Sequence, residues 1–343
     1  MSTPVLQVND LKKHFPLRGG LLGGTTGYVY AVDGVSFDIA KGETLSLVGE
    51  SGCGKSTVGK AVLRLFGLTG GQVILDGTRI DDMPASALRP LRRRMQVVFQ
   101  DPFSSLNPRM RVRDILAEPI RNFGMAKNSA ELEAKVAGLM DKVRLPRDAV
   151  NRWPHEFSGG QRQRICIARA LAADPDLIIC DEAVSALDVS VKAQIVNLLQ
   201  DLQKDLGLAY LFIAHDLSVV KHISDRVAVM YLGRIVEEGP KADLYGRPVH
   251  PYTQALLSAV PAVDVDPAAK RRRIVLEGEI PNPSAPPPGC HFHPRCFRAD
   301  GRCGVEVPAF RPDGDGATRT ACHHAGPLTV PVTPAPETLG ASP

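Results

Sequence analysis

The chain has 343 residues, which corresponds to about two domains at ~150 residues each. Charged residues make up 23% and hydrophobic residues 44%, a composition that is ordinary for a globular protein and excludes a disordered or fibrous one. The 41 lysines and arginines exceed the 37 aspartates and glutamates by four, and a net charge of +4 is too small to indicate a nucleic-acid-binding protein.

The sequence contains no apolar run that approaches the ~18 to 20 residues needed for a membrane-spanning helix. The first residues, MSTPVLQVNDLKKHF, also lack the apolar segment of a signal peptide. We therefore expect a cytosolic protein with reduced thiols. Any role at a membrane would then depend on a partner.

Residues 1 to about 245 alternate short apolar runs with helical patterns, as expected for an α/β domain with a mostly parallel sheet. Three runs are apolar enough to be strands covered on both faces: Thr44–Val48, Leu177–Cys180 and Ala209–Ile213. Between about 101 and 160 the pattern predicts helices instead, at Val112–Ile120 and Ala130–Val143. We interpret this stretch as a helical subdomain inserted into a nucleotide-binding domain that covers residues 1–250.

The first predicted strand ends at a phosphate-binding loop (P-loop), G-x-x-x-x-G-K-[ST], at residues 49–56, and a helical pattern follows at Ser56–Phe66. Strand, loop and helix are the context in which backbone N–H groups surround nucleotide phosphates. Lys55 should reach the β- and γ-phosphates, and Ser56 should bind Mg²⁺. The predicted contacts to ATP are Gly49, Glu50, Ser51, Gly52, Cys53, Gly54, Lys55, Ser56 and Thr57.

Two carboxylates, Asp181 and Glu182, end the second predicted strand. Parallel strands bring their carboxyl ends to one sheet edge, so both groups should lie beside the phosphates. Asp181 would belong to the Mg²⁺ shell, whereas Glu182 would orient and polarise the attacking water.

The run Phe157-Ser-Gly-Gly-Gln-Arg-Gln-Arg164 lies between these two motifs and resembles the signature sequence of ATP-binding cassette (ABC) ATPases. It precedes a predicted helix at Gln161–Ala172, so Ser158, Gly159, Gly160 and Gln161 would form a second anion-binding helix start. The family's other motifs, which contain Gln100, Asp188 and His215, lie around it in the family's order. By this resemblance the chain is identified as an α/β P-loop NTPase of the ABC type, with a RecA-like core.

This resemblance implies roles for residues outside the P-loop. Gln100 would sense Mg²⁺ and water, His215 would contact the γ-phosphate, and Asp188 would face the opposite nucleotide site. In the family, the signature caps the ATP of a facing cassette, so that ATP joins two subunits. An aromatic residue ahead of the P-loop stacks on adenine. Phe15 occupies the usual place, with Tyr28 and Tyr30 as rivals.

Ala183 departs from the family, which usually has proline after the catalytic glutamate. Without that proline the turn should be looser, but no catalytic group is removed. We therefore expect an active ATPase.

The flanking segments resemble ATPases of bacterial dipeptide and oligopeptide permeases, and more narrowly their F-type subunit. The runs that carry the resemblance are Leu11-Lys-Lys-His-Phe, Ala31-Val-Asp-Gly-Val-Ser-Phe, Val98-Phe-Gln-Asp-Pro-Phe-Ser-Ser-Leu-Asn-Pro, Met230-Tyr-Leu-Gly-Arg and His250-Pro-Tyr-Thr-Gln-Ala-Leu-Leu. The resemblance implies a D-type partner ATPase, two membrane permeases and an extracytoplasmic peptide-binding protein, with this chain at the cytoplasmic face of the inner membrane. Importers of glutathione or nickel complexes, and a soluble ABC ATPase acting on nucleic acid, remain alternatives.

A C-terminal extension is predicted at residues 251–325, followed by a disordered tail at 326–343. It contains a stretch with five prolines, Pro281–Pro288, and four cysteines: Cys290, Cys296, Cys303 and Cys322. Four thiolates in a reduced compartment favour an iron–sulfur cluster or zinc. The wide sequence gaps between the cysteines suit an iron–sulfur cluster, which is larger than a single Zn²⁺ ion. Similar cysteines in peptide-permease ATPases are associated with iron–sulfur binding, which favours [4Fe–4S]. Zinc, with His291, His293, His323 or His324 as further ligands, and free thiols are the alternatives.

Overall fold

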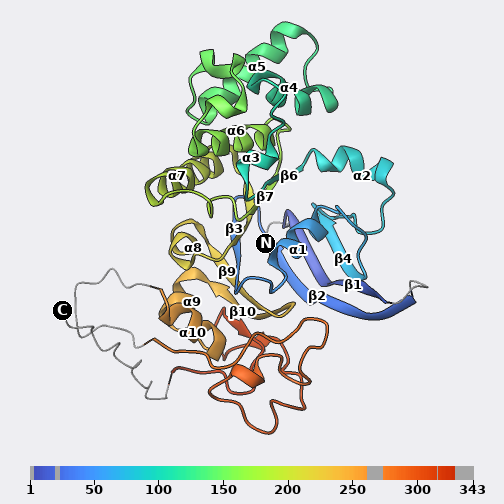
Figure 1. Cartoon of the computed structure of the whole chain (residues 1–343), viewed down its shortest axis with the longest axis vertical. Helices are drawn as coiled ribbons and strands as arrows, with labels where there is room; N and C mark the ends of the chain where they lie inside the picture. Colours follow the sequence, from blue (N-terminus) through green and yellow to red (C-terminus); the bar gives the residue numbers. More distant parts are fainter. Residues whose placement is uncertain (1–3, 20–23, 261–272, 315, 329–343) are drawn as a thin grey trace, which may run out of the picture.

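The structure is a computed structural model that describes residues 4–19, 24–260, 273–314 and 316–328. Residues 329–343, most of the predicted disordered tail, lie outside this part of the chain. Figure 1 shows a helical region at one end, the sheets in the middle and the C-terminal extension at the other end. None of the described helices has both the length and the apolar content needed to cross a membrane.

Within the described residues, eight strands form the central sheet, in the order β11-β12-β10-β9-β3-β8-β7-β6. Five neighbouring strands are parallel: β9 (Arg226–Tyr231), β3 (Thr44–Val48), β8 (Ala209–Ala214), β7 (Leu177–Asp181) and β6 (Met95–Val98). Every residue of β3, β7 and β8 is buried, as strands covered on both faces require. The three predicted strands and the mostly parallel sheet are confirmed.

Helices cover the faces of this sheet (Figure 1). They are α1 (Lys55–Val62), α2 (Ala85–Arg92), α7 (Val189–Leu206), α8 (Leu217–Ile223), α9 (Lys241–Gly246) and α10 (Pro251–Ser258). The helix after the P-loop is shorter than the predicted Ser56–Phe66, so that boundary was wrong. Its last helical residue is Val62 because Arg64 takes a left-handed conformation, with φ of 54°, which an α-helix cannot contain.

The inserted subdomain is helical, as predicted. It comprises α3 (Pro102–Ser105), α4 (Val112–Asn122), α5 (Ser129–Lys142), the 3₁₀ helices η1 (Arg147–Asn151) and η2 (Pro154–Glu156), and the start of α6 (Gly159–Leu171). In α4, Val112, Ile115, Leu116 and Ile120 are buried at helical spacing. Side-chain caps fix two helix starts, since Asp101 accepts hydrogen bonds from α3 and Asn128 accepts one from α5. These caps set where each helix begins.

A second, antiparallel sheet was not predicted from the sequence. In the described part of the chain its order is β2-β1-β4-β5, with β1 (Leu6–Gly19), β2 (Gly24–Ile39), β4 (Gly70–Leu75) and β5 (Thr78–Arg79). Leu6, Val8 and Leu11 of β1 point into a core that also contains Val58 and Ala61 of α1. The sheet therefore supports the P-loop helix from one side.

The C-terminal extension has few regular elements: η4 (His293–Arg295), β11 (Arg311–Pro312) and β12 (Arg319–Thr320). It is nevertheless joined to the central sheet, because β12 pairs antiparallel with β10 (Arg234–Pro240). Phe292 is only 1% exposed and packs against Tyr231 and Tyr252, at ring distances of 5.2 and 5.3 Å. The extension is thus packed on the nucleotide-binding domain.

Candidate nucleotide and metal sites

A cavity of about 340 Å³ lies at the junction of β3 and α1. Most of its lining comes from residues predicted to bind nucleotide: Ser51, Gly52, Cys53, Gly54, Lys55, Ser56, Thr57, Gln100 and Glu182. The first N–H groups of an α-helix have no partner within the helix, so those at the start of α1 are available to an anion. Loop and helix start therefore form a site suited to phosphate groups.

Two glycines allow the P-loop to pass close to neighbouring backbone. Gly54 has φ of 106°, and a Cβ there would lie 2.0 Å from the carbonyl oxygen of Ala31. Gly49 has φ of 151°, and its Cβ would lie 2.2 Å from the carbonyl oxygen of Met230. Any other residue would push the loop away from these strands. The P-loop backbone is thus packed closely against strands of both sheets, β2 and β9.

Lys55 is 4% exposed, and its ammonium group is held inside the loop. Nζ donates to the carbonyl oxygens of Gly49 at 2.8 Å and Glu50 at 2.9 Å. It also lies 3.6 Å from Sγ of Cys53, a buried thiol whose pKa is raised by that burial. The P-loop backbone therefore sets the position of Lys55, the one lysine or arginine among the described residues that line the cavity.

Two of the three residues predicted to hold Mg²⁺, Ser56 and Asp181, are in contact, and the third, Gln100, lines the same cavity. Ser56 Oγ donates to Asp181 Oδ1 at 2.6 Å, although the two residues are 125 positions apart. Burial raises the pKa of the Asp181 carboxyl, and the Ser56 hydrogen bond opposes that shift. A hydroxyl and a carboxylate are oxygen donors of the kind Mg²⁺ prefers. This donor set fits the metal of a MgATP substrate.

Glu182 follows β7 with φ of 50°, a conformation that is rare for a residue other than glycine. Its N–H donates to the carbonyl oxygen of Ile213 at 3.0 Å, and its carbonyl oxygen accepts from the Ser185 backbone N–H and hydroxyl. These bonds hold the turn where the family usually has proline, and Ala183 is buried within it. His215 Nδ1 lies 3.5 Å from Glu182 Oε2. The strained, left-handed backbone of Glu182 is of a kind that often occurs at catalytic residues.

Phe15, the predicted adenine contact, is not among the residues that line the cavity. Phe15 is 37% exposed, packs edge-on against Phe66 at 5.6 Å and has Lys13 Nζ 4.8 Å from its ring centre. Tyr30 does line the cavity, whereas Tyr28 is 44% exposed and does not. The role of Phe15 stays a prediction.

The signature residues Ser158, Gly159, Gly160 and Gln161 are not among the residues that line this cavity. Ser158 caps α6: its Oγ accepts from the Gln161 N–H at 3.3 Å, and its own N–H donates to Gln161 Oε1 at 3.0 Å. A Cβ on Gly160 would lie 2.4 Å from a Val191 methyl group of α7. Gly160 therefore allows the starts of α6 and α7 to approach, and the exposed Asp188 lies next to this junction.

The four cysteines of the extension come together. Burial raises the pKa of Cys322 to about 12. The nearby sulfurs of Cys296, Cys290 and Cys303 also raise this pKa, through charge repulsion. Backbone N–H groups also point at two sulfurs, from Arg298 to Cys296 at 3.4 Å and from His324 to Cys322 at 3.3 Å. Clustered thiols with N–H···S bonds suit metal-bound thiolates.

Sequence reasoning missed one member, Asp300, of a group of possible metal ligands that also contains the predicted Cys303 and His324. Asp300, Cys303 and His324 offer ligand atoms that all lie within 4.8 Å of one another. His324 Nε2 is 2.9 Å from Asp300 Oδ2. The other three candidate histidines each have a ring nitrogen near a backbone carbonyl oxygen: His291 near Leu232, His293 near Cys290, and His323 near Glu306. Asp300 could not be recognised as a metal ligand from the sequence, because a single aspartate forms no motif with a characteristic spacing.

Contacts from the extension to the P-loop were also missed. Arg295 forms an ion pair with Glu50, and Pro283 lines the nucleotide cavity. These residues lie more than 200 positions from the P-loop in sequence. A pairing over such a separation has no local pattern that a single sequence could reveal.

The fold and site agree with comparisons to known proteins. Residues 32–185 match the profile described as ABC transporter, and residues 236–303 match that of the oligopeptide/dipeptide transporter C-terminal region. The chain is similar to the oligopeptide transport ATP-binding protein AppF of Bacillus subtilis, with 52% identity over 93% of this chain and 97% of that protein. It is 50% identical to the dipeptide transport ATP-binding protein DppF of Escherichia coli, over 92% and 93% of the two chains.

Solved structures show the same fold. The ATP-binding cassette MJ0796, in a post-hydrolysis dimer bound to ADP and phosphate, is 27% identical with a TM-score of 0.61, over 69% of this chain and 98% of that one. The protein cbiO1 of Clostridium perfringens, part of the cbiONQ transporter complex, is 26% identical with a TM-score of 0.62, over 71% and 92%. The chain therefore belongs to the ABC transporter ATP-binding proteins, in the branch that carries the oligopeptide/dipeptide transporter C-terminal region. As a member of that family it is a transport-coupled ATPase.

Replacing Glu182 by glutamine should stop turnover while MgATP remains bound. Only the group that takes the water's proton is lost, so hydrolysis should fall by about 10² to 10⁴-fold with nucleotide affinity retained. Phosphate release and equilibrium nucleotide binding measure the two effects separately. Lys55→Ala should instead fail at binding, and the exposed Glu133→Gln is the control. Hydrolysis by Glu182→Gln at the wild-type rate would contradict the assignment.

Proposed function

We propose that the chain is the ATP-hydrolysing subunit of a peptide importer. The observation that carries this proposal is the combination of a complete P-loop site with an extension matching the oligopeptide/dipeptide transporter C-terminal region. Relatives at 50 to 52% identity are named for oligopeptide and dipeptide transport. The peptide itself would bind elsewhere, because the residues lining the nucleotide cavity suit phosphates.

In the proposed mechanism, residues 49–57 bind MgATP through the P-loop, with Ser56 and Asp181 at the metal. Glu182 accepts a proton from the attacking water as the water approaches the γ-phosphate, and His215 steadies that carboxylate. Gln100 lies in the same cavity and begins the connection to α3, so it links hydrolysis to the helical subdomain.

The site is proposed to be completed by a second cassette. Ser158, Gly159, Gly160 and Gln161 lie outside this chain's own cavity, at an exposed helix start that can bind an anion. Each P-loop would therefore need a partner's signature, and Asp188 would face the opposite site. The resemblance to F-type subunits favours a D-type ATPase as partner, two membrane permeases and an extracytoplasmic peptide-binding protein. The chain would then lie at the cytoplasmic face of the inner membrane.

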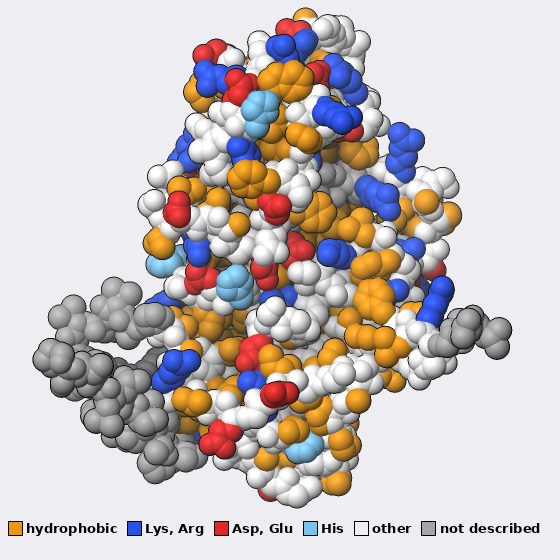
Figure 2. All heavy atoms as spheres, in the orientation of Figure 1, with side chains coloured by type: hydrophobic (Ala, Val, Ile, Leu, Met, Phe, Trp, Pro, Cys, Tyr) orange, Lys and Arg blue, Asp and Glu red, His pale blue; other side chains and the backbone are white. Residues whose placement is uncertain are grey.

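A nucleic-acid function is the less favoured alternative. Acidic and basic side chains both occur across the face shown in Figure 2, in keeping with the net charge of +4. A DNA-binding surface requires basic side chains gathered along a stripe or patch. Importers of glutathione or nickel complexes share this type of ATPase and differ in their permeases and binding proteins.

Uptake assays in a strain lacking this chain test the peptide assignment. Uptake of labelled di- and oligopeptides should fall to background and return with the wild-type gene but not with Glu182→Gln. Labelled glutathione and nickel serve as parallel substrates. Normal peptide uptake, with loss of glutathione or nickel uptake, would reject peptides as the substrate.

The surface around α3 is proposed to receive a cytoplasmic helix of a permease. Phe103 is 65% exposed, with the Arg162 guanidinium 4.0 Å from its ring centre. Leu106, in contrast, is 2% exposed and belongs to the core, so a change there would act on folding. Phe103, unlike Leu106, can therefore be tested in the predicted coupling segment, Phe103 to Leu106, without disturbing the core.

Phe103→Ala should reduce transport at least about tenfold while basal ATPase activity stays within about twofold, because exposed aromatic anchors contribute strongly to interfaces. Transport and ATPase activity are measured in the same membranes, with Val305→Ala as a control at another exposed apolar residue. Loss of basal hydrolysis with intact permease binding would place Phe103 in the nucleotide site instead.

The extension is proposed to hold a [4Fe–4S] cluster through Cys290, Cys296, Cys303 and Cys322. Four thiols around one Zn²⁺ would lie about 3.8 Å apart, given Zn–S bonds of ~2.3 Å in a tetrahedron. Among the described residues, the group whose ligand atoms all lie within 4.8 Å is Asp300, Cys303 and His324, and it includes one of the four cysteines. In the part of the chain that the structure describes, no three of the four thiols form such a group, which supports the larger iron–sulfur cluster, whereas the group around Asp300 supports zinc as the alternative. The cluster's role would be structural.

Anaerobically purified protein should be brown, with absorbance near ~400 nm and about four irons per chain. Metal analysis and absorbance measure this directly, and Cys322→Ser should lower the iron content. The matched control is Cys166→Ser, because Cys166 is a buried cysteine in α6, outside the extension. Colourless protein with one zinc per chain, lost in His324→Ala, would establish the alternative.

A further inference from the structure

Glu50, within the P-loop, is held by a residue of the C-terminal extension. Arg295 Nη1 donates to Glu50 Oε2 at 2.7 Å, and Nη2 donates to Oε1 at 3.1 Å. The Arg295 side chain is 7% exposed and that of Glu50 is 26% exposed. A bidentate, largely desolvated pair of this kind fixes geometry as well as contributing energy.

The backbone of the same P-loop residue is held from a second direction. The N–H of Glu50 donates to Tyr252 Oη at 2.9 Å. Tyr252 belongs to α10 and packs edge-on against Tyr231, at 4.8 Å between ring centres. Arg295 lies over Tyr231 at 6.0 Å, and Phe292 completes the aromatic group. Packing thus limits the movement of both groups that hold Glu50.

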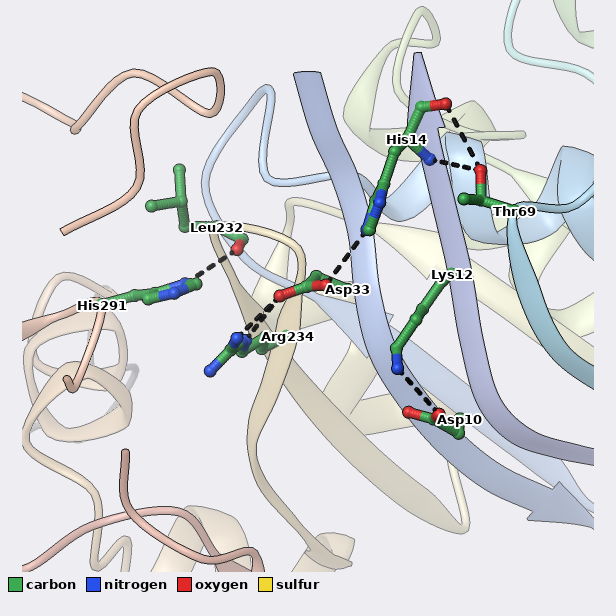
Figure 3. A network of polar contacts seen from close by, with 8 residues as sticks. All are labelled: Asp10, Lys12, His14, Asp33, Thr69, Leu232, Arg234 and His291. Carbon is green, nitrogen blue, oxygen red and sulfur yellow. Dashed lines mark hydrogen bonds and ion pairs between the residues drawn. The ribbon is translucent and has the colours of Figure 1, made fainter. Parts of the chain in front are cut away.

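The extension also reaches the far wall of the nucleotide cavity. The carbonyl oxygen of Pro283 accepts the N–H of Tyr30 at 3.0 Å, and both residues line the cavity. His291 Nδ1 lies 3.4 Å from the carbonyl oxygen of Leu232, another lining residue (Figure 3). Figure 3 also shows Arg234 and His14 meeting at Asp33, an arrangement that joins β10, β2 and β1 next to this contact. The extension therefore contributes to the frame of the site.

Glu50 connects this frame to the phosphate-binding cation. Its carbonyl oxygen accepts from Lys55 Nζ at 2.9 Å. We propose that Arg295 is a positioning residue for ATP binding, which holds Glu50, and through Glu50 the P-loop and Lys55, in the arrangement that receives phosphates. Nucleotide affinity in this protein then depends on a residue far outside the nucleotide-binding domain.

Calorimetric titration of the full chain with MgADP tests this proposal, because MgADP binds without hydrolysis. Arg295→Ala should weaken binding roughly tenfold, as is typical when a residue that supports a ligand-contacting group is lost. Arg295→Lys, which can make one of the two contacts, should lose less. In steady-state hydrolysis, KM for ATP should rise while kcat stays within about twofold, since Arg295 does not touch the reacting atoms.

A double-mutant cycle separates the ion pair from general damage to the extension. Glu50→Gln should weaken binding similarly, and Glu50→Gln combined with Arg295→Ala should be no worse than either single change. Arg302→Ala is the matched control, because it removes an exposed arginine that pairs with Glu306 in the same extension. Unchanged affinity in folded Arg295→Ala, additive losses in the double variant, or an equal loss in Arg302→Ala would overturn the proposal. If Arg295→Ala does not fold, Arg295→Lys decides the question, because it keeps the charge and loses one of the two contacts; wild-type affinity in that variant would also overturn the proposal.

Discussion

The rest of the structure depends on one constraint, which is the fixed position of the P-loop. Its backbone N–H groups, at the start of α1, can bind phosphates only if the loop is held rigidly in place. Gly54 and Gly49 satisfy this constraint by passing within van der Waals contact of Ala31 and Met230 carbonyl oxygens, where any Cβ would collide. Those carbonyls belong to strands of two different sheets. Both sheets are therefore needed to shape one short loop.

The same arrangement supports the proposal that a second cassette completes the nucleotide site. The P-loop, Asp181 and Glu182 converge at the carboxyl edge of the parallel strands, whereas the signature helix start lies outside the cavity. If the signature helix start also binds phosphates, as we propose, ATP would be a ligand shared between two subunits. Glu182, with its left-handed backbone, lies at the turn that directly follows β7.

Sequence reasoning predicted what is local and failed where contacts are distant. The P-loop, the buried strands and the helical subdomain each have a short pattern with a physical cause, and all were found. The antiparallel sheet was missed because β1 and β2 pair with several register shifts and are only partly buried, which blurs their alternation. Asp300 beside Cys303, and Arg295 against Glu50, join residues whose spacing obeys no motif. The extension's link to the nucleotide site could therefore come only from the fold.

The central claim is that this chain's nucleotide site works only when a second cassette completes it. The most direct measurement is the ATPase rate per chain over a range of chain concentrations, with and without the partner cassette. A rate per chain that rises with concentration or with added partner, and is lost on dilution, is the predicted result. A rate per chain that stays constant on dilution and does not respond to a second cassette would contradict the account.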